Sequence, residues 1–391
     1  MVNVEILCAA YRRRFGGGPP AAVVRAPGRV NLIGEHVDYN DGLVLPIAIE
    51  RATHIAVGPS DRETFRLYSA NVDQQVEFAV DDRSHPEKGR WDAYGRGVAA
   101  ELAQAGIRLA PANLYIESDV PVGAGLSSSA ALEVATALAL LFAAGTTMEA
   151  REVARICRLA EHHYAGVPCG IMDQFVCAMA SPNAALLLDC RDQQIENIPW
   201  PAGDAVVVVI DSQCRHKLSD GTYAARVREC RRAVEQVRAV NPSVQSLRDV
   251  SPEQLIAQRE RMEGTTFRRA HHVIGEIQRT RDAAAALRAG DFKRFGRAMN
   301  ASHDSLRDDY EVSSPQLDDL VEVVRGVPGV FGARMTGAGF GGCIVAVAER
   351  SAVGSVEAAV RRDYDPRHGV TAPVLTTRPC EGARLTRLTH P

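Results

Sequence analysis

Hydrophobic and polar residues repeat with two different periods along the chain, which predicts a protein of mixed helices and strands. Runs rich in β-branched residues predict strands at residues 21–26 and 43–49, and a turn signal at Asn40–Gly42 precedes the second run. A helical period covers residues 90–106, and the alternation over residues 113–121 is typical of a half-buried strand. The first half of the chain therefore contains both kinds of element.

This pattern is interrupted at residues 195–205, where two prolines and a glycine precede the apolar, strand-like run at residues 206–210. A chain of 391 residues exceeds the size at which one hydrophobic core usually keeps growing, so we expect two domains. We place the boundary near Pro201, which gives an N-terminal domain of residues 1–201 and a C-terminal domain of residues 202–391.

Helical periods account for much of the remaining sequence. One covers residues 148–166, and the next helix is expected to begin near Pro168. A glycine-rich strand–loop–strand pattern occupies residues 329–348. Beyond the boundary, helices are predicted at residues 223–240, 252–262, 266–289 and 315–325.

Composition and charge exclude several classes of protein. Hydrophobic residues make up 46% of the chain and charged residues 24%, as in ordinary globular proteins. The net charge of -3 provides no basic field for nucleic acid, and we assign the runs Arg12–Arg14 and Arg268–Arg269 to solvated surface. We therefore expect no nucleic-acid partner.

Cysteine usage and the apolar segments indicate a compartment. The nine cysteines include no CxxC pair, which predicts reduced thiols and a cytoplasmic protein. Charge and glycine interrupt the first residues before a signal-peptide core could form. The longest apolar stretch, Val134–Gly145, is well short of the ~20 residues of a membrane span, so we expect no membrane partner.

Glycines and serines gather at residues 122–129, directly before an apolar helical run. Unpaired amides at a helix N-terminus favour an anion such as phosphate. Gly123 and Gly125 let the backbone approach a ligand, and the hydroxyls of Ser127–Ser129 can cap the helix, bind phosphate or reach Mg²⁺. The alternative is a helix cap after a glycine turn. A Walker-type loop is excluded here, because it requires a lysine that the segment lacks.

Polar side chains are dense between the first two predicted strands. Charged donors and acceptors that are held rigidly suit the hydroxyls of a sugar, although an acidic surface hairpin is the alternative. A further acid, Asp173, lies at the start of a predicted helix, where such residues usually compensate the helix dipole. The residues between the strands are Arg29, Asn31, Glu35, His36, Asp38 and Tyr39.

Two other features have a structural explanation as their alternative. Four glycines between Gly337 and Gly342 indicate close approach by a ligand or by another backbone, or a tight turn. The adjacent pairs His162–His163 and His271–His272 cannot face one site on a helix, and no HExxH or spaced Cys/His quartet occurs. We therefore assign these histidines to structure or surface.

Taken together, these stretches resemble the three signature motifs of the GHMP small-molecule kinases, and the first resembles the galactokinase branch of that family. The first motif is RAPGRVNLIGEHVDYNDGLVLPIAI, from Arg25 to Ile49. The second is VPVGAGLSSSAALEVA and the third is RMTGAGFGGC. Two further stretches, EHHYAGVPCGIMDQF and SLRDDYEVSSPQLDDLV, are also similar, so the resemblance runs from about Ala26 to Ala346.

The resemblance implies an α+β, two-domain GHMP kinase fold with the active site between the domains. The N-terminal domain would be an α/β domain of the ribosomal protein S5 domain 2-like type, and the C-terminal domain a ferredoxin-like α+β domain. The implied cofactors are ATP and Mg²⁺. The implied reaction transfers the γ-phosphate of ATP to the anomeric 1-hydroxyl of α-D-galactose, as in galactose catabolism. We expect a monomer whose partners are galactose and ATP.

The resemblance also implies residue roles by motif. Asp173 would face the anomeric hydroxyl, and Arg29 would lie near the transferred phosphate. The sugar would be held by Glu35, His36, Asp38, Gly170, Asp173 and Tyr223. The nucleotide would be held by Gly123, Ala124, Gly125, Leu126, Ser127, Ser128, Ser129 and Ala130. Mg²⁺ would be bound by Ser128 or Ser129 together with Glu161.

Alternatives to this function remain open. One is a family kinase for another sugar such as N-acetylgalactosamine. Another is a non-catalytic sugar-sensing regulator, although such proteins tend to have a damaged serine loop, and here both that loop and Asp173 are intact. The sequence departs from the family at Ala338, where glycine is frequent, and at Asp211–Gln213, where an asparagine-rich triplet is common.

Overall fold

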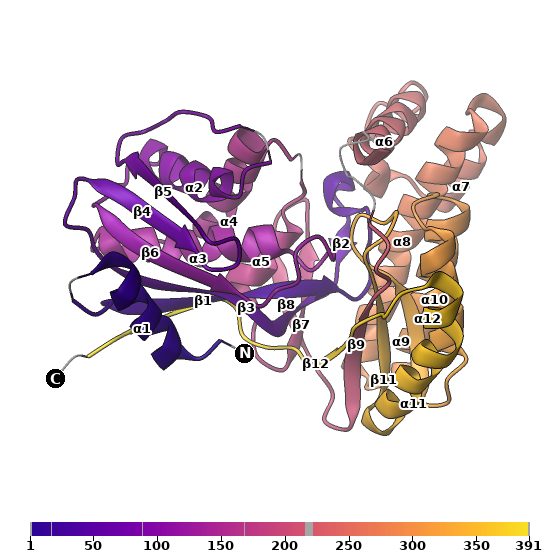
Figure 1. Cartoon of the computed structure of the whole chain (residues 1–391). Coiled ribbons are helices and arrows are strands. Elements are labelled where there is room, and N and C mark those ends of the chain that lie inside the picture. Colours follow the sequence, from indigo (N-terminus) through magenta and orange to yellow (C-terminus); the bar gives the residue numbers. More distant parts are fainter. Residues whose placement is uncertain (1, 17, 88, 168, 216–221, 390–391) are drawn as a thin grey trace.

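The structure is a computed structural model that describes residues 2–16, 18–87, 89–167, 169–215 and 222–389. Elements of the first half of the chain gather on one side of the molecule and most of those of the second half on the other (Figure 1). Pro168, which we expected near the start of a helix, lies outside the described residues.

Each helix and strand expected from the sequence pattern has a counterpart, but several elements were not predicted. The missed helices are Val4–Phe15, Phe292–Asp308, Val353–Ala359 and Asp365–His368. The missed strands are Thr64–Ser69, Gln74–Ala79, Ala184–Asp189, Ile195–Pro199, Val374–Thr377 and Arg384–Arg387. The helices are α1 (Val4–Phe15), α2 (Asp92–Gln104), α3 (Ser128–Ala143), α4 (Ala150–Ala160), α5 (Met172–Met179), α6 (Thr222–Arg238), α7 (Pro252–Ile256), α8 (Gly264–Arg288), α9 (Phe292–Asp308), α10 (Pro315–Arg325), α11 (Val353–Ala359) and α12 (Asp365–His368). The strands are β1 (Ala22–Asn31), β2 (Leu43–Val44), β3 (Pro46–Pro59), β4 (Thr64–Ser69), β5 (Gln74–Ala79), β6 (Ala112–Ser118), β7 (Ala184–Asp189), β8 (Ile195–Pro199), β9 (Ala205–Asp211), β10 (Val330–Met335), β11 (Cys343–Glu349), β12 (Val374–Thr377) and β13 (Arg384–Arg387).

A six-stranded sheet with the order β13-β1-β3-β6-β4-β5 forms the base of the first half. Its neighbouring strands are antiparallel except for β4 and β6. Helix α3 packs on β1 and β3 and also contacts α2, α4 and α5, which explains why its sequence is apolar on nearly every side. Helix α1 lies on the opposite face of the sheet, where Leu7 and Tyr11 pack with Val23 and Ala56 (Figure 1).

Two smaller sheets complete the architecture. The second half contains a four-stranded sheet with the order β10-β11-β9-β12, against which α9 and α10 pack. A three-stranded sheet with the order β2-β7-β8 contacts both β3 and α8. One cluster of buried apolar residues extends from the first sheet to Phe295, Met299 and Val345 of the second half. The two halves therefore share a buried boundary.

The expected domain boundary lies where the chain passes between sheets. Pro201 falls between β8 and β9, so the chain leaves the three-stranded sheet and enters the four-stranded sheet at this point. The division into residues 1–201 and 202–391 stays a prediction. The pairing of β13 with β1 places residues 384–387 in the sheet of the first half.

In the part of the chain that the structure describes, no helix has both the length and the apolar character needed to cross a membrane.

Gly296 and Gly332 allow α9 and β10 to touch backbone to backbone. A Cβ atom at Gly296 would lie 1.9 Å from the carbonyl oxygen of Phe331. Because a strand backbone cannot move aside easily, we expect Gly296→Ala to lower the free energy of unfolding by ~1–3 kcal/mol or more, as measured by denaturant unfolding.

Gly354 in α11 provides the matched control. A Cβ atom there would meet no described atom within 4 Å. Gly354→Ala is therefore expected to leave stability unchanged or to raise it by up to ~1 kcal/mol through helix propensity. Equal unfolding free energies for the two alanine variants would contradict the importance of the close contact at Gly296.

Candidate functional site

Arg29 and Asp173 form a bidentate ion pair at the boundary between the halves. Arg29 lies in β1 and Asp173 in the first turn of α5. Nε and Nη2 of Arg29 each donate to one carboxylate oxygen of Asp173 at 2.7 Å, and their side chains are 6% and 23% exposed. Burial disfavours the charge of Arg29, but the adjacent carboxylate more than compensates and raises the pKa of Arg29. Asp173 is thus fixed in orientation with part of its carboxylate still accessible.

The serine–glycine loop touches this ion pair directly. Oγ of Ser127 donates to Oδ2 of Asp173 at 2.5 Å, and Nη1 of Arg29 donates to the carbonyl oxygen of Gly125 at 2.5 Å. Ser127 has a left-handed backbone, with φ 57° and ψ 50°, and immediately precedes α3. Its hydroxyl is therefore directed to the carboxylate, while Ser128 and Ser129 begin the helix as half-buried residues.

Within the loop, backbone and side chains have different surroundings. Gly123 and Gly125 are exposed and have positive φ values of 71° and 76°. The side chains of Ala124, Leu126 and Ala130 are buried in the core. These three positions can therefore offer a ligand only backbone groups, whereas the glycines present open backbone to it.

The third motif is dense in glycine because its backbone runs close to other backbones. A Cβ atom at Gly337 would lie 3.5 Å from Cα of Gly125, in ordinary contact with the serine–glycine loop. A Cβ atom at Gly339 would lie 2.2 Å from the carbonyl oxygen of Val312, which no side chain could tolerate. Of the alternatives that the sequence left open, the structure shows close backbone approach.

Arg215 lies beside the exposed end of the same loop. Its Nε atom is 4.0 Å from the position that a Cβ atom of Gly123 would take. Nη1 and Nη2 of Arg215 donate to the two carboxylate oxygens of Asp211 at 2.7 and 2.6 Å. The departure from the family at Asp211 is therefore accommodated by an ion pair. Arg215 also supplies a cation beside the loop that was not predicted.

Asp38 packs directly over Gly170. A Cβ atom at Gly170 would fall 1.6 Å from Oδ2 of Asp38, so only glycine fits at this position. Burial, together with the nearby carboxylates of Asp173 and Glu35, raises the pKa of Asp38 to about 7. Asp38 is therefore poised between its neutral and charged forms near neutral pH.

Glu35 is paired with an arginine of the third motif. Nη2 of Arg334 donates to Oε2 of Glu35 at 2.8 Å, and the two side chains are 0% and 4% exposed. Burial raises the pKa of Glu35, although Arg334 and Arg29 oppose this rise. No role was predicted for Arg334. The signal available was a cation at the start of a motif that otherwise consists mainly of small residues.

His36 is part of a chain of hydrogen bonds. Its Nε2 lies 3.1 Å from the carbonyl oxygen of Ala338, and its Nδ1 lies 2.8 Å from the hydroxyl of Tyr39. The Tyr39 hydroxyl is 2.8 Å from that of Tyr310. Burial and the positive charge of neighbouring groups lower the pKa of His36 to about 3, so the ring is neutral. Because a carbonyl only accepts, Nε2 carries the proton and Nδ1 accepts from Tyr39.

Tyr223 completes this aromatic wall. Its ring centroid lies 5.7 Å from that of His36 and 5.4 Å from that of Tyr39. Burial holds the pKa of Tyr223 well above its usual value, so the phenol keeps its proton. The structure thus brings together the residues that the sequence assigned to a sugar, although both ring nitrogens of His36 already have partners.

Glu161 begins a π-helical turn, Glu161–Ala165, directly after α4; such turns are frequent at functional sites. Nε2 of Gln174 donates to Oε2 of Glu161 at 2.7 Å and to Oε2 of Glu133 at 3.0 Å. The hydroxyl of Ser129 lies close to Glu161 and favours the charged form of this carboxylate. Gln174 and Glu133 were missed from the sequence, although Gln174 directly follows Asp173.

The surroundings of Glu161 fit a hard divalent cation. Burial raises the pKa values of both Glu161 and Glu133, and Oε1 of buried Glu133 has no hydrogen-bond partner among the described residues. A cation would compensate this buried negative charge. A carboxylate with a hydroxyl suits Mg²⁺, which usually keeps water and phosphate oxygens as further ligands. The described residues contain no group of three or more His, Cys, Asp or Glu that could hold a metal without such ligands.

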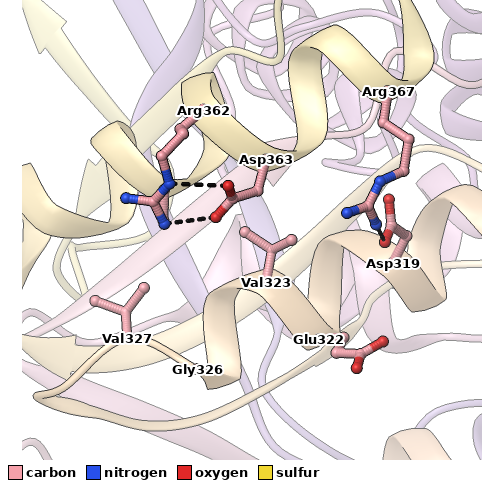
Figure 2. Close-up of a pocket in the computed structure, with 9 residues that line it drawn as sticks. Asp319, Glu322, Val323, Gly326, Val327, Arg362, Asp363 and Arg367 are labelled. Atoms are coloured by element: carbon pink, nitrogen blue, oxygen red, sulfur yellow. Dashed lines mark hydrogen bonds and ion pairs between the residues drawn. The ribbon is translucent and has the colours of Figure 1, made fainter.

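A separate surface pocket of about 330 Å³ lies beside α10 (Figure 2). Its lining includes Arg362, Asp363 and Arg367, and the arginines are already paired with Asp363 and Asp319. Of the residues that line it, only Asp319 belongs to a family-like stretch, and none belongs to the three signature motifs. We therefore place the candidate site at Asp173 and not in this pocket.

Three family models match separate parts of the chain. Residues 9–59 match the galactokinase galactose-binding signature, residues 93–181 the GHMP kinases N terminal domain, and residues 283–366 the GHMP kinases C terminal domain. The expected α+β fold with two GHMP domains is thereby confirmed.

Individual relatives are similar over nearly their whole length. A galactokinase of Roseiflexus sp. (strain RS-1) is 44% identical over 98% of this chain and 97% of its own. The galactokinase of Homo sapiens is also 44% identical, over 96% of this chain and 95% of its own. The solved structure of Lactococcus lactis galactokinase complexed with galactose has a TM-score of 0.93 at 32% identity, covering 98% of this chain and 100% of that one. Since identity of this level extends over almost the entire length, the chain belongs to the galactokinases of the GHMP kinase family.

Proposed function

We propose that the chain transfers the γ-phosphate of ATP to the anomeric 1-hydroxyl of α-D-galactose, giving galactose 1-phosphate and ADP. The observation that carries this proposal is the contact of Ser127 with Asp173, which brings the serine–glycine loop next to a fixed carboxylate. A phosphoryl group at the loop and a sugar hydroxyl at the carboxylate would then be adjacent. The galactokinase relatives support galactose as the sugar.

Asp173 would orient the 1-hydroxyl and accept its proton as the phosphoryl group is transferred. Phosphoryl transfer passes through a loose transition state, so alignment and charge stabilisation contribute more than a strong base. The bidentate contact with Arg29 provides this alignment. Arg29 also places a cation beside the transferred group.

As a kinase of this family the chain uses ATP. We assign its phosphates to the exposed backbone of Gly123 and Gly125, the amides at the start of α3 and the hydroxyls of Ser128 and Ser129. Arg215 would supply a positive charge in place of the absent lysine. Ala124, Leu126 and Ala130 would contribute backbone only.

Mg²⁺ would be held by Glu161 together with Ser129, with Ser128 as the alternative hydroxyl. When bound, the ion would neutralise phosphate charge. Gln174 would keep Glu161 in place, since its amide donates to that carboxylate.

Sugar selection would depend on the acidic and aromatic wall of the site. Asp38 and Tyr223 would read the axial 4-hydroxyl that distinguishes galactose from glucose, and Glu35 would accept from another hydroxyl. We assign His36 a place in the wall beside the sugar, because its nitrogens are already hydrogen-bonded. A cytoplasmic location, a monomeric state and the lack of nucleic-acid and membrane partners stay predictions.

Asp173→Ala is expected to abolish turnover while leaving galactose binding measurable by calorimetry. General-base assistance alone is worth ~10²–10⁴-fold, so a larger loss would show that orientation is lost as well. Asp189→Asn serves as a control, because Asp189 is an 18% exposed carboxylate paired with Arg248 outside the site. Near-normal ADP production by Asp173→Ala would remove Asp173 from this role.

The raised pKa of Asp38 predicts a pH dependence of sugar use. The pKa of Asp38 is about 7, so at lower pH the free protein carries a neutral Asp38. The neutral acid is a weaker acceptor for a sugar hydroxyl than the carboxylate. We therefore expect kcat/KM for galactose to increase as the pH rises through 7, and Asp38→Asn to lack this transition. Asp38→Ala is expected to reduce discrimination against glucose by ~1–3 kcal/mol. A wild-type profile that is flat across this pH range would refute the assignment.

Glu161→Gln is expected to raise the Mg²⁺ concentration needed for half-maximal activity by ~10- to 100-fold, since a neutral amide is a poor ligand for a hard cation. The KM for galactose is expected to stay unchanged. Asp92→Asn is the control, because Asp92 is also buried but its carboxylate is paired with Arg90 and Arg96. An unaltered Mg²⁺ dependence in Glu161→Gln would exclude Glu161 as a ligand.

A further inference from the structure

The turn Gly34–His36, which carries Glu35, is held by a helix from the other half of the chain. Oε1 of Glu276 in α8 accepts from the backbone N–H of Gly34 at 3.0 Å and from that of Glu35 at 3.2 Å. Glu276 is 0% exposed. A fully buried carboxylate is thus used to bind two consecutive backbone amides that lie 242 and 241 residues away in sequence.

His272 lies four residues before Glu276 in α8 and binds the same segment, Gly34–His36. Its Nε2 lies 3.2 Å from the carbonyl oxygen of Glu35, and its Nδ1 lies 3.0 Å from Oγ of Ser305. Because the carbonyl can only accept, Nε2 carries the proton. Residues four apart lie on one face of a helix, so α8 presents both an acceptor and a donor to the turn.

Glu276 is itself fixed by donors of the second half. Oγ of Ser302 donates to Oε1 at 2.6 Å, and Nε of Arg279 donates to Oε2 at 2.7 Å. Burial opposes its charge, but Arg279 and the other positive neighbours lower the pKa of Glu276 to about 2. It therefore stays an anion and a strong acceptor for the amides of the turn.

The turn needs this support because its backbone is strained. Gly34 has φ 94°, and a Cβ atom there would lie 2.4 Å from the carbonyl oxygen of Leu43. His36 has φ 60°, a conformation that costs a residue with a side chain ~1–3 kcal/mol. Such a strained conformation persists only where surrounding contacts hold it. Here the contacts to the amides of Gly34 and Glu35 and to the carbonyl oxygen of Glu35 come from α8.

We propose that Glu276 and His272 are positioning residues that hold the turn Gly34–His36 in the shape that presents Glu35 and His36 to the sugar. They set the affinity for galactose and leave the affinity for ATP unchanged. The proposal rests on the proposed function, since it assumes that these two residues line the sugar site. It assigns a function to His272, for which a structural or surface position is predicted from the sequence.

Two near-isosteric substitutions test His272. In His272→Gln the amide nitrogen takes the place of Nε2 and keeps the contact with the carbonyl oxygen of Glu35, whereas in His272→Asn the amide takes the place of Nδ1 and loses it. We expect a ~3- to 10-fold rise in the KM for galactose, and a matching loss of galactose affinity by calorimetry, in His272→Asn. His272→Gln is expected to stay within ~2-fold of wild type, as is the KM for ATP in both variants.

Glu276→Gln provides a second test that does not depend on His272. The neutral amide is a weaker acceptor, and its NH₂ group faces the donor Arg279, so we expect the KM for galactose to rise at least ~10-fold. The matched control is Asp92→Asn, because Asp92, in the first turn of α2, is also 0% exposed and pairs with Arg90 and Arg96. Asp92→Asn is expected to lower the melting temperature without changing the KM for galactose.

The outcomes separate this inference from the proposed function. Wild-type protein that produces no ADP with galactose would refute the proposed function. Active wild-type protein would instead overturn the inference if the KM for galactose were the same in His272→Asn, His272→Gln and Glu276→Gln as in wild type. An equal rise in the KM values for galactose and ATP would also overturn it, since that result is expected from general loss of structure.

Discussion

The carboxylate of Asp173 receives three hydrogen bonds from two distant segments, two from Arg29 and one from Ser127. Arg29 in turn donates to the backbone of Gly125, so strand β1, the serine–glycine loop and helix α5 are joined at one point. These bonds fix the direction of the carboxylate before any substrate arrives. A reaction that depends on alignment gains most from such a preformed arrangement.

The proposed sugar side of the site is organised by buried charge from the second half of the chain. Arg334 neutralises Glu35, and Glu276 binds the amides of the turn that carries it. Neither pair is exposed, so each charge depends on its partner for compensation. The two halves are consequently joined by the same polar contacts that shape the proposed sugar site, in addition to their shared apolar cluster.

The sequence predicted the parts of the site that depend on local patterns. The serine–glycine loop lies between a strand and a helix as expected, and Asp173 opens α5 as expected. Local patterns could not assign Glu276 and Arg334, because their partners Gly34 and Glu35 are remote in sequence. They could not assign Gln174 either, because it acts through the side chain of Glu161. Helix α9 was also missed. The direction of the Ser127 hydroxyl depends on a left-handed backbone angle that no pattern of residue types specifies.

The pairing of β13 with β1 has a consequence for synthesis of the chain. Residues 384–387 cover the β1 edge of the six-stranded sheet, whose other strands all lie within the first 118 residues. During translation that edge therefore stays open, with unpaired amide and carbonyl groups, until the whole second half has left the ribosome. An uncovered edge is a template for pairing with other chains, so nascent polypeptides of this protein are exposed to association in proportion to the time that the second half takes to emerge.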